Sequence, residues 1–303
     1  MKKKYNLYQV DSFTKELFKG NPASVVINAD GLTSHMMQAI ARELNNSETA
    51  FVFSSDSDKY DVYLRYFTPT KEVPICGHAT IAAHYVRAYE KQLNSMRVIQ
   101  KTGAGILPVD IVKENDDYKI IMTQGKVELG NYILGENREI LLSALNITED
   151  DLAENCPIQI VSTGHSKVMI AINNLELLNN LEPDLIKLAN LSELIDCNGY
   201  YVFTLDSDEK DILVKGRMFA PAIGIVEDPV TGNANGPLGA YLVHHKVVDY
   251  TDETFKFKAK QGEAMNRTGT MEVHVKTYNK EPIEVKIIGD AMIVFKTSVY
   301  INI

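Results

Sequence analysis

The chain carries one short sequence frame twice, and this repeat constrains its fold more than any other feature. Residues 72–79 read EVPICGHA, and residues 227–234 read EDPVTGNA. An R-x-F-x-P frame precedes each copy, at 65–69 and at 217–221, and the second copy has three extra residues before its glutamate. Frames that recur in the same order predict a duplicated α/β unit.

Each copy is expected to fold into the same series of elements. The apolar runs 51–53 (FVF) and 201–203 (YVF) indicate strands, each followed by a polar turn, the R-x-F-x-P strand and a loop with Pro and Gly. Small and apolar residues at helical spacing then predict helices at 78–91 and 233–246. Four strand-like runs follow Thr254 without helices, so we expect the sheet to close at the end of the chain.

Composition and charge favour a small-molecule partner. The proportions of 45% hydrophobic and 23% charged residues are typical of a globular protein. The net charge is -9, and no run of Lys or Arg follows the opening MKKK, which argues against binding to nucleic acid or to an anionic membrane. No apolar run is long enough to span a bilayer, so we expect a cytoplasmic protein.

The sequence indicates neither a metal site nor an organic cofactor. Cys76, Cys156 and Cys197 are widely spaced and form no C-x-x-C pair, which argues against a disulfide framework and a structural zinc site. The chain contains no P-loop, and no G-x-G-x-x-G motif follows a predicted strand. We therefore expect no metal and no nicotinamide or flavin cofactor.

The loop glycines of the repeat are candidate substrate-binding residues. Gly77 and Gly232 each stand at the start of a predicted helix, where backbone N–H groups lack intrahelical partners and attract carboxylate or phosphate oxygens. The absence of a side chain lets a ligand approach these groups. The alternative is that both glycines only permit tight turns.

The two copies differ at the positions where chemistry would be carried out. The first copy contributes Cys76 and His78, and the second places Thr231 and Asn233 at the same positions. A histidine can donate or accept a proton near neutral pH. Cys76 is a candidate thiolate base at a helix start, but a two-thiol mechanism needs a second cysteine where Thr231 stands.

Two carboxylates complete the candidate set. Glu48 lies at the leading edge of a strand that runs into apolar sequence, where a carboxyl group can serve as an acid or base at carbon. Its alternative role is an exposed connection between helix and strand. Asp228 replaces Val73 of the first copy and precedes Pro229, so it is either a site residue or a turn former.

At these residues the sequence resembles the phenazine-biosynthesis isomerase family (PhzF-like proteins), which belongs to the diaminopimelate epimerase fold superfamily. The similar stretches follow one another over nearly the whole chain. They are VDSFTKELFKGNPASVV (10–26), ELNNSETAFV (43–52), RYFTPTKEVPICGHAT (65–80), STGHSK (162–167), RMFAPAIGIVEDPVTGNA (217–234) and QGEAMNRTG (261–269).

The resemblance implies an α+β fold of two pseudo-symmetric domains, each a curved, mostly antiparallel sheet wrapped around a central helix. Together with the repeat, it leads us to expect an N-terminal epimerase-like domain of residues 1–123 plus 288–303 and a C-terminal one of residues 124–287. It further implies an active site between the domains, isomerisation by proton shuttling without a cofactor, and a homodimer.

The resemblance also assigns roles to individual residues. The family's catalytic glutamate corresponds to Glu48, its site histidine to His78 and its site aspartate to Asp228, with Gly77 and Gly232 as the loop glycines. The phenazine enzyme has a serine after the second glycine, whereas this chain has Asn233. The resemblance therefore does not extend to this position, and it does not imply that the two proteins share a substrate.

We expect an isomerase acting on a small carboxylate-bearing substrate, with Glu48 moving the proton and His78 and Asp228 binding and polarising the substrate. Gly77 and Gly232 would offer backbone N–H groups to its carboxylate, and Cys76, Thr231 and Asn233 would line the site. The alternatives are a thiol-assisted amino-acid racemase and a non-catalytic protein that binds small anions.

Overall fold

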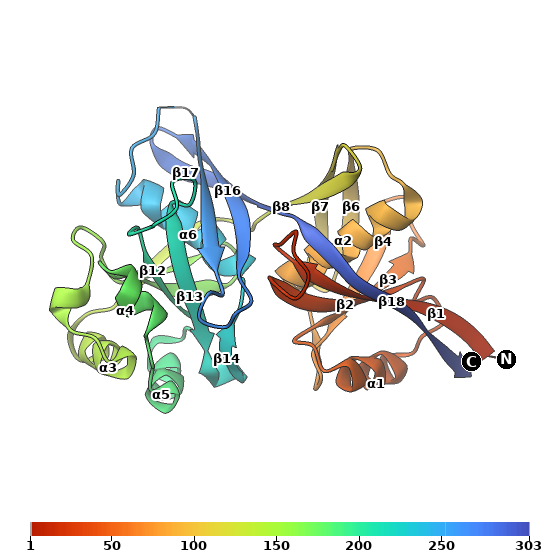
Figure 1. Cartoon of the computed structure of the whole chain (residues 1–303), viewed down its shortest axis with the longest axis horizontal. Coiled ribbons are helices and arrows are strands. Elements are labelled where there is room, and N and C mark those ends of the chain that lie inside the picture. The colour runs from red at the N-terminus through yellow and green to blue at the C-terminus, as the bar shows by residue number, and fades with distance from the viewer. Residues whose placement is uncertain (1, 252, 303) are drawn as a thin grey trace. The chain divides into compact units, whose positions relative to one another are not determined.

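The computed structural model describes residues 2–251 and 253–302, and the chain divides into two compact units (Figure 1). Unit 1 comprises residues 1–123 and 288–303, and unit 2 comprises residues 124–287. Within the described residues, no helix combines the length and the apolar character needed to cross a membrane.

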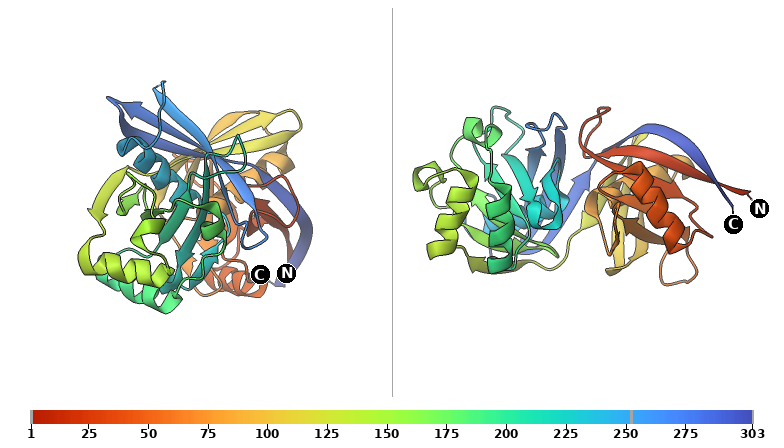
Figure 2. Two further views of the ribbon diagram at one scale, coloured as in Figure 1. Left: turned by 60° about the vertical axis from the view of Figure 1, so that its left-hand side comes forward. Right: turned by 90° about the horizontal axis from the view of Figure 1, so that it is seen from below.

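The sheet of unit 1 contains strands from both ends of the chain. Its elements are β1 (Lys2–Ser12), β2 (Asn21–Ile27), α1 (Ser34–Leu44), β3 (Thr49–Ser54), β4 (Val62–Phe67), β5 (Glu72–Val73), α2 (Gly77–Lys91), β6 (Met96–Thr102), β7 (Gly105–Glu114), β8 (Asp117–Thr123) and β18 (Ala291–Asn302). The last strand, β18, pairs antiparallel with β1, as expected from the surplus of late strands, and Figure 2 shows the two running side by side.

Unit 2 carries more helices around a similar sheet. Its elements are β9 (Glu128–Tyr132), α3 (Gly135–Leu145), η1 (Glu149–Asp151), β10 (Gln159–Ser162), β11 (Ser166–Ala171), α4 (Leu175–Asn179), α5 (Leu185–Ile195), β12 (Tyr200–Thr204), β13 (Val214–Ala220), η2 (Pro221–Ile223), β14 (Ile225–Asp228), α6 (Gly232–His244), β15 (Thr254–Gln261) and β16 (Gly269–Tyr278). Strand β17 (Glu281–Gly289) returns the chain to unit 1.

The same pairing pattern builds both sheets. In unit 1, β2 pairs parallel with β3, β3 antiparallel with β4, and β4 parallel with β6. In unit 2, β11 pairs parallel with β12, β12 antiparallel with β13, and β13 parallel with β15. The other described pairings within each unit are antiparallel. The repeat thus extends from the sequence frames to sheet topology, and the extra residues of the second copy fall at η2.

Each unit encloses one helix of the repeat. Helix α2 is buried from His78 to Ala88, and it contacts β1, β2, β3, β7, β8 and β18. Helix α6 is buried from Ala234 to Val243 and contacts β10, β11 and β16. A helix with apolar or small residues on every side is expected to be buried in a core. The helices predicted at 78–91 and 233–246 correspond to α2 and α6.

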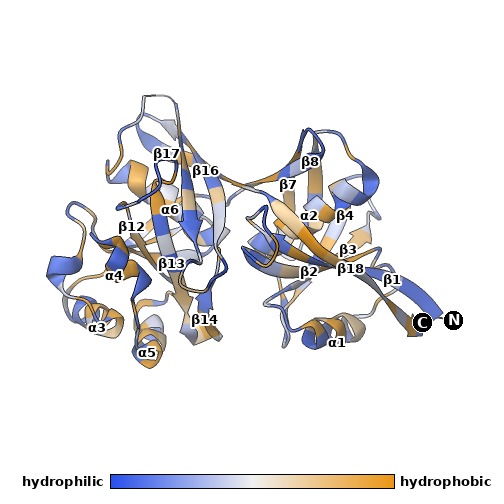
Figure 3. Ribbon diagram, in the orientation of Figure 1, coloured by the Kyte–Doolittle hydropathy of each residue, from blue (hydrophilic) through white to orange (hydrophobic). Residues whose placement is uncertain are grey.

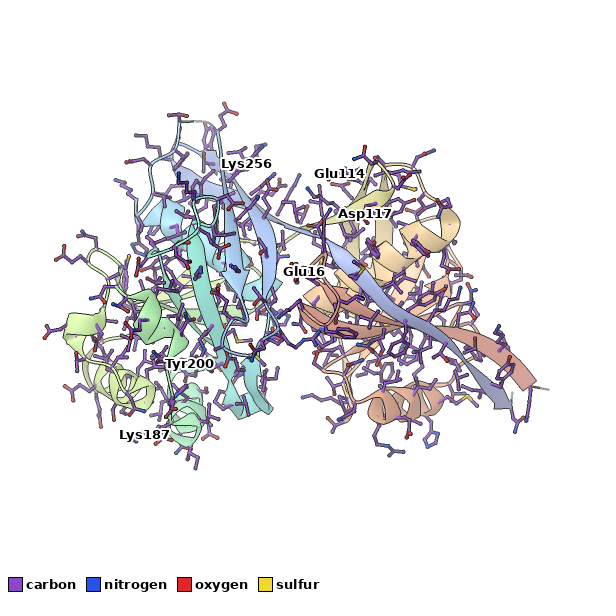
Figure 4. The ribbon with its side chains drawn as sticks, viewed as in Figure 1. Glu16, Glu114, Asp117, Lys187, Tyr200 and Lys256 are labelled. Atoms are coloured by element: carbon purple, nitrogen blue, oxygen red, sulfur yellow. The ribbon has the colours of Figure 1, made fainter. Side chains whose placement is uncertain are left out.

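The outer face of each sheet packs against further helices. In unit 1, Met37 and Ala41 of α1 join the core with Phe51 of β3. In unit 2, α3, α4 and α5 cover Val168, Tyr200 and Phe219, and Figure 3 shows hydrophobic and hydrophilic residues alternating along α3 and α5. The Tyr200 hydroxyl, labelled in Figure 4, donates to the Leu188 carbonyl of α5 at 2.8 Å. The three outer helices of unit 2 were not predicted from the sequence.

The arginine of each R-x-F-x-P frame forms a bidentate ion pair with the glutamate of the following frame. Arg65 donates to both oxygens of Glu72 at 2.7 and 2.6 Å, and Arg217 donates to both oxygens of Glu227 at 2.9 and 2.8 Å. The surroundings differ. The Arg217 side chain is 10% exposed and also donates to the Leu178 and Leu181 carbonyls, whereas Glu72 is 42% exposed.

We predict that Arg217→Met lowers the free energy of unfolding by about 3 kcal/mol or more, because it leaves Glu227 and buried carbonyls without a donor. Arg65→Met should cost about 1 kcal/mol, since Glu72 remains in contact with water. Urea denaturation followed by circular dichroism compares the two variants. Equal losses would show that burial does not decide the strength of this pair.

Candidate functional site

The loop between α1 and β3 holds Glu48 in unit 1. Helix α1 ends at Leu44, and its C-cap residue Asn45 adopts a left-handed conformation with φ of 53°. The next residue, Asn46, donates its side-chain amide to Gln9 Oε1 at 2.7 Å and to Ser24 Oγ at 2.6 Å. The Glu48 carbonyl then accepts from the Ser24 N–H at 3.3 Å. Because side chains of β1 and β2 fix this loop, the backbone of Glu48 is firmly placed.

His78, in the first turn of α2, is the centre of the unit 1 site group, which we define as Glu48, Cys76, Gly77 and His78. Its Nε2 lies 3.4 Å from Glu48 Oε2 and 3.2 Å from Ser47 Oγ. Its Nδ1 lies 3.5 Å from Cys76 Sγ. One tautomer satisfies both sides: Nε2–H donates to the Glu48 carboxylate while Nδ1 accepts from the Cys76 thiol.

These side chains are largely withdrawn from water. The Glu48 side chain is 16% exposed and that of His78 is 9% exposed. The Ser12 hydroxyl donates to the His78 carbonyl at 2.8 Å, which fixes the first turn of α2 against β1. An imidazole that lies between a carboxylate and a thiol can pass a proton from one to the other with little movement. The unit 1 site group therefore has the parts of an acid/base site.

The same three donors can also be considered as metal ligands. Ligand atoms of Glu48, Cys76 and His78 all lie within 4.8 Å of one another. Carboxylate, thiolate and imidazole are the ligand types that Zn²⁺ prefers. Sequence spacing had indicated no metal-ligating cluster, because Glu48 is distant in sequence from the other two. The fold therefore brings together three possible metal ligands that their sequence spacing did not indicate.

The start of α2 has open space beside its backbone. The N-cap residue Cys76 makes no side-chain cap, and the first turn holds no acidic residue. A Cβ added to Gly77 would meet no atom within 4 Å. Neither packing nor a positive φ therefore requires glycine here, and a ligand can approach the free N–H groups of this turn.

The unit 2 site group, defined as Asp228, Thr231, Gly232 and Asn233, is held by a glutamine. The Thr231 hydroxyl donates to Asp228 Oδ2. Gln261 Nε2 donates to the Asp228 carbonyl at 2.7 Å and to Thr231 Oγ1 at 3.1 Å, and its Oε1 accepts from the Thr231 N–H at 3.1 Å. The Thr231 hydroxyl is thus engaged by Asp228 and Gln261, and it accepts no hydrogen bond from the first turn of α6.

Three buried polar atoms of unit 2 lack protein partners among the described residues. Two of them border α6, namely Asn233 Oδ1 in its first turn and Thr163 Oγ1 in the β10–β11 turn, and the third is the Tyr250 hydroxyl oxygen. Thr163 Oγ1 lies only 3.2 Å from the position of a Cβ added to Gly236, so this turn packs against α6. Buried polar groups are normally paired, and an unpaired one marks a place where a ligand or water can bind.

The structure therefore brings Glu48, Cys76, Gly77 and His78 together within unit 1, and Asp228, Thr231, Gly232 and Asn233 within unit 2. Sequence analysis did not identify the supporting residues. Ser12 and Gln261 lie within the conspicuous stretches VDSF and QGEA, but nothing in their spacing reveals that they hold the first turns of α2 and α6. Cys76, Cys156 and Cys197 are all buried.

Comparison with known proteins identifies relatives of the whole chain. The family model described as phenazine biosynthesis-like protein matches residues 10–297. An uncharacterized isomerase of Clostridium acetobutylicum is 67% identical over 302 residues, which cover 100% of both chains. The trans-2,3-dihydro-3-hydroxyanthranilate isomerase of Pseudomonas aeruginosa is 29% identical over 80% of this chain and 81% of its own.

Solved structures share the fold. A phenazine biosynthesis protein of the PhzF family from Bacillus anthracis has a TM-score of 0.88 and 32% identity, covering 99% of this chain and 100% of its own. A hydroxyproline epimerase from Agrobacterium vitis has a TM-score of 0.64 with 11% identity, covering 99% of this chain and 93% of its own, and this likeness concerns the fold alone. The expected epimerase-like α+β fold is confirmed.

We predict that Gly77→Ala leaves the free energy of unfolding unchanged or raises it by up to about 1 kcal/mol, because the added methyl group meets open space and alanine favours the helix. The matched control is Gly103→Ala, whose Cβ would lie 2.8 Å from Pro74 Cα and should destabilise unit 1. Thermal denaturation of both variants provides the comparison. A large loss in Gly77→Ala would show that this glycine serves the fold.

Proposed function

Because the chain belongs to the phenazine biosynthesis-like family, we propose that it is an isomerase that moves a proton between carbons of a small carboxylate-bearing substrate without a cofactor. The observation that carries this proposal is the contact between Glu48 and His78 beside the open first turn of α2. An acid/base pair next to free backbone N–H groups can bind a carboxylate and exchange a proton at a neighbouring carbon.

We assign the proton transfer to Glu48. Its carboxylate takes a proton from an activated carbon and returns it to another carbon of the same conjugated system, while His78 donates a hydrogen bond to it from Nε2. The N–H groups at Gly77 attract the substrate carboxylate, whose negative charge the helix N-terminus favours. Negative charge that develops on the substrate when the carbon loses its proton is delocalised toward the substrate carboxylate, which these N–H groups already bind.

We further propose that the unit 2 site group binds the same substrate. Asp228 would accept a hydrogen bond from a hydroxyl or ammonium substituent, and the N–H groups at Gly232 would meet a second acceptor. The unpartnered Asn233 Oδ1 supports this proposal, because a substrate donor would satisfy an otherwise lone buried acceptor. Asn233 takes the place of the serine of the phenazine enzyme, so we expect a substrate with a donor at this position.

A thiol-assisted racemase is the alternative mechanism, since Cys76 contacts His78. Two-thiol chemistry needs a second thiol at the position of Thr231, whose hydroxyl instead donates to Asp228. The single thiol therefore favours the carboxylate mechanism. A non-catalytic anion-binding protein would keep both helix N-termini but would exchange no carbon-bound hydrogen.

The decisive comparison is between Glu48→Gln and Cys76→Ser. We predict that Glu48→Gln retains the shape and the contact with His78 but lowers turnover by about 10²-fold or more, because the titratable group is lost. Cys76→Ser should have a much smaller effect. The measurement is solvent deuterium incorporation into the substrate, tested first with trans-2,3-dihydro-3-hydroxyanthranilate and then with metabolites that co-purify with the protein.

If Cys76→Ser abolished deuterium incorporation while Glu48→Gln left it intact, a one-thiol mechanism would replace the proposed one. If a co-purified ligand bound tightly and the wild-type protein exchanged none of its hydrogens, the anion-binding alternative would be correct. A cytoplasmic location and a homodimer stay predictions, and light scattering of the purified protein tests the second.

A further inference from the structure

The three side-chain donors of the unit 1 site group have a spacing close to that of metal ligands. In a tetrahedral zinc site with bonds of about 2.0–2.3 Å, neighbouring ligand atoms lie about 3.3–3.6 Å apart. His78 Nε2 lies 3.4 Å from Glu48 Oε2 and 3.9 Å from Cys76 Sγ. All three ligand atoms lie within 4.8 Å of one another. Two edges of the tetrahedron are therefore nearly formed, and rotation of the Glu48 side chain about its own bonds can close the third.

This group differs from the other concentration of acidic side chains in the described part of the chain. In unit 2, Asp208, Glu209 and Glu263 surround the ammonium of Lys215, whose positive charge would repel a metal ion. Glu48, Cys76 and His78 form the one group of three donors with metal-ligand spacing found among residues 2–251 and 253–302. Mixed donors at this spacing favour a metal ion over a further ion pair.

Burial and charge also suit a divalent cation. The Glu48 side chain is 16% exposed, and Cys76 is 9% exposed as a residue. One carboxylate and one thiolate balance the two positive charges of the metal, so no net charge is placed away from water. The open space beside Gly77 leaves room for a water molecule in the fourth position, which zinc sites with three protein ligands keep open.

The protons of the group can be rearranged to permit coordination. Before a metal binds, Nε2–H of His78 donates to Glu48, and Nδ1 accepts from the Cys76 thiol. When Nε2 binds the metal, its proton is released to water, and the thiol proton moves across the 3.5 Å contact to Nδ1. The carboxylate, the thiolate and a neutral imidazole then coordinate, as metal binding requires. One proton is released for each metal ion bound.

The donor types decide which metal ion fits. Thiolate and imidazole suit Zn²⁺, whereas Mg²⁺ and Ca²⁺ prefer oxygen ligands. We propose that the unit 1 site group binds Zn²⁺ through Glu48, Cys76 Sγ and His78 Nε2, and that the bound ion reversibly blocks proton transfer. The metal occupies the lone pairs that Glu48 and His78 need as acid and base. The block rests on the proposed function, whereas the metal site rests on the geometry alone.

Other interactions compete with the metal for these ligands. Ser47 Oγ lies 3.2 Å from His78 Nε2, and Cys76 takes part in a further interaction besides its contact with His78. The first turn of α2 attracts anions, so it opposes the approach of a cation. We therefore expect weaker binding than in structural zinc sites with four protein ligands, and EDTA should remove the metal.

The test is a titration of the metal-free, full-length protein. Calorimetry with Zn²⁺ should show one ion bound per chain, and Co²⁺ should produce the near-ultraviolet charge-transfer band of a cobalt–thiolate bond. Cys76→Ser should abolish this band and weaken Zn²⁺ binding by about 100-fold or more, because even the loss of a supporting residue costs about 10- to 100-fold in metal affinity. Glu48→Gln should weaken binding as well but keep the band, since the thiolate remains.

The matched control is Cys197→Ser. It removes another buried thiol, whose Sγ donates to the Gly199 carbonyl at 3.7 Å, and it should change neither the affinity nor the cobalt band. Thermal denaturation provides a second readout and shows that each variant folds. Zn²⁺ should raise the melting temperature of the wild type and of Cys197→Ser, but not that of Cys76→Ser, because only a ligand bound to the folded state stabilises it.

An unchanged Zn²⁺ affinity in Cys76→Ser would overturn the metal site, and so would an equal loss in Cys197→Ser or the absence of the cobalt–thiolate band in the wild type. The proposed function is tested separately, by substrate deuteration in the metal-free wild-type protein. Where deuteration occurs, Zn²⁺ should suppress it and EDTA should restore it. Deuteration that continued with one Zn²⁺ bound per chain would overturn the block.

Discussion

Both units contain the same interaction, the bidentate ion pair that joins the two frames of each sequence repeat. It joins the strand of the R-x-F-x-P frame to the short strand that follows, and in each copy the guanidinium also lies over the ring of the phenylalanine two residues on, at 5.2 Å in unit 1 and 5.0 Å in unit 2. It contacts the outer layer as well: Arg65 donates to Ser34 at the start of α1, and Arg217 donates to the end of α4. The loop that leads into α2 or α6 follows directly after the glutamate of this pair. The residues that both copies share therefore position the residues in which the copies differ.

The enclosed helix explains why the variable part holds the candidate chemistry. Helices α2 and α6 are buried along most of their length, and their first turns present backbone N–H groups that the helix itself does not satisfy. Conventional capping would close these turns. Neither Cys76 nor Thr231 caps its helix through the side chain, and the Thr231 hydroxyl donates a hydrogen bond to Asp228. The fold thus supplies two anion-attracting turns, and the residues beside them differ.

The parts of this fold that could be predicted are those with a repeated sequence frame or a periodic spacing of apolar residues. Both enclosed helices, the strands of the two frames and the late strands were visible because apolar spacing and repeated letters report local structure. The outer helices α3, α4 and α5 have no counterpart in the frame, and their amphipathic character was overlooked. Among the candidate site residues, Glu48 and His78 were proposed from pattern and resemblance, whereas Gln261 and Ser12 act through contacts between distant segments. The pattern within one segment does not show which distant segment it will contact, so these two residues could not be identified from the sequence.

Two buried lysines of unit 2, Lys167 and Lys215, show how divergence can act beyond the frame. Lys215 is neutralised by three carboxylates and stabilises the structure around it, while Lys167 has a carbonyl and more distant charges. A core selected for stability alone would replace an ammonium of the second kind with an apolar side chain of similar length. Gly199 is fitted to the Lys167 stem, since any side chain there would displace it. The glycine and the lysine stem are therefore fitted to each other on the side of the sheet that α6 covers.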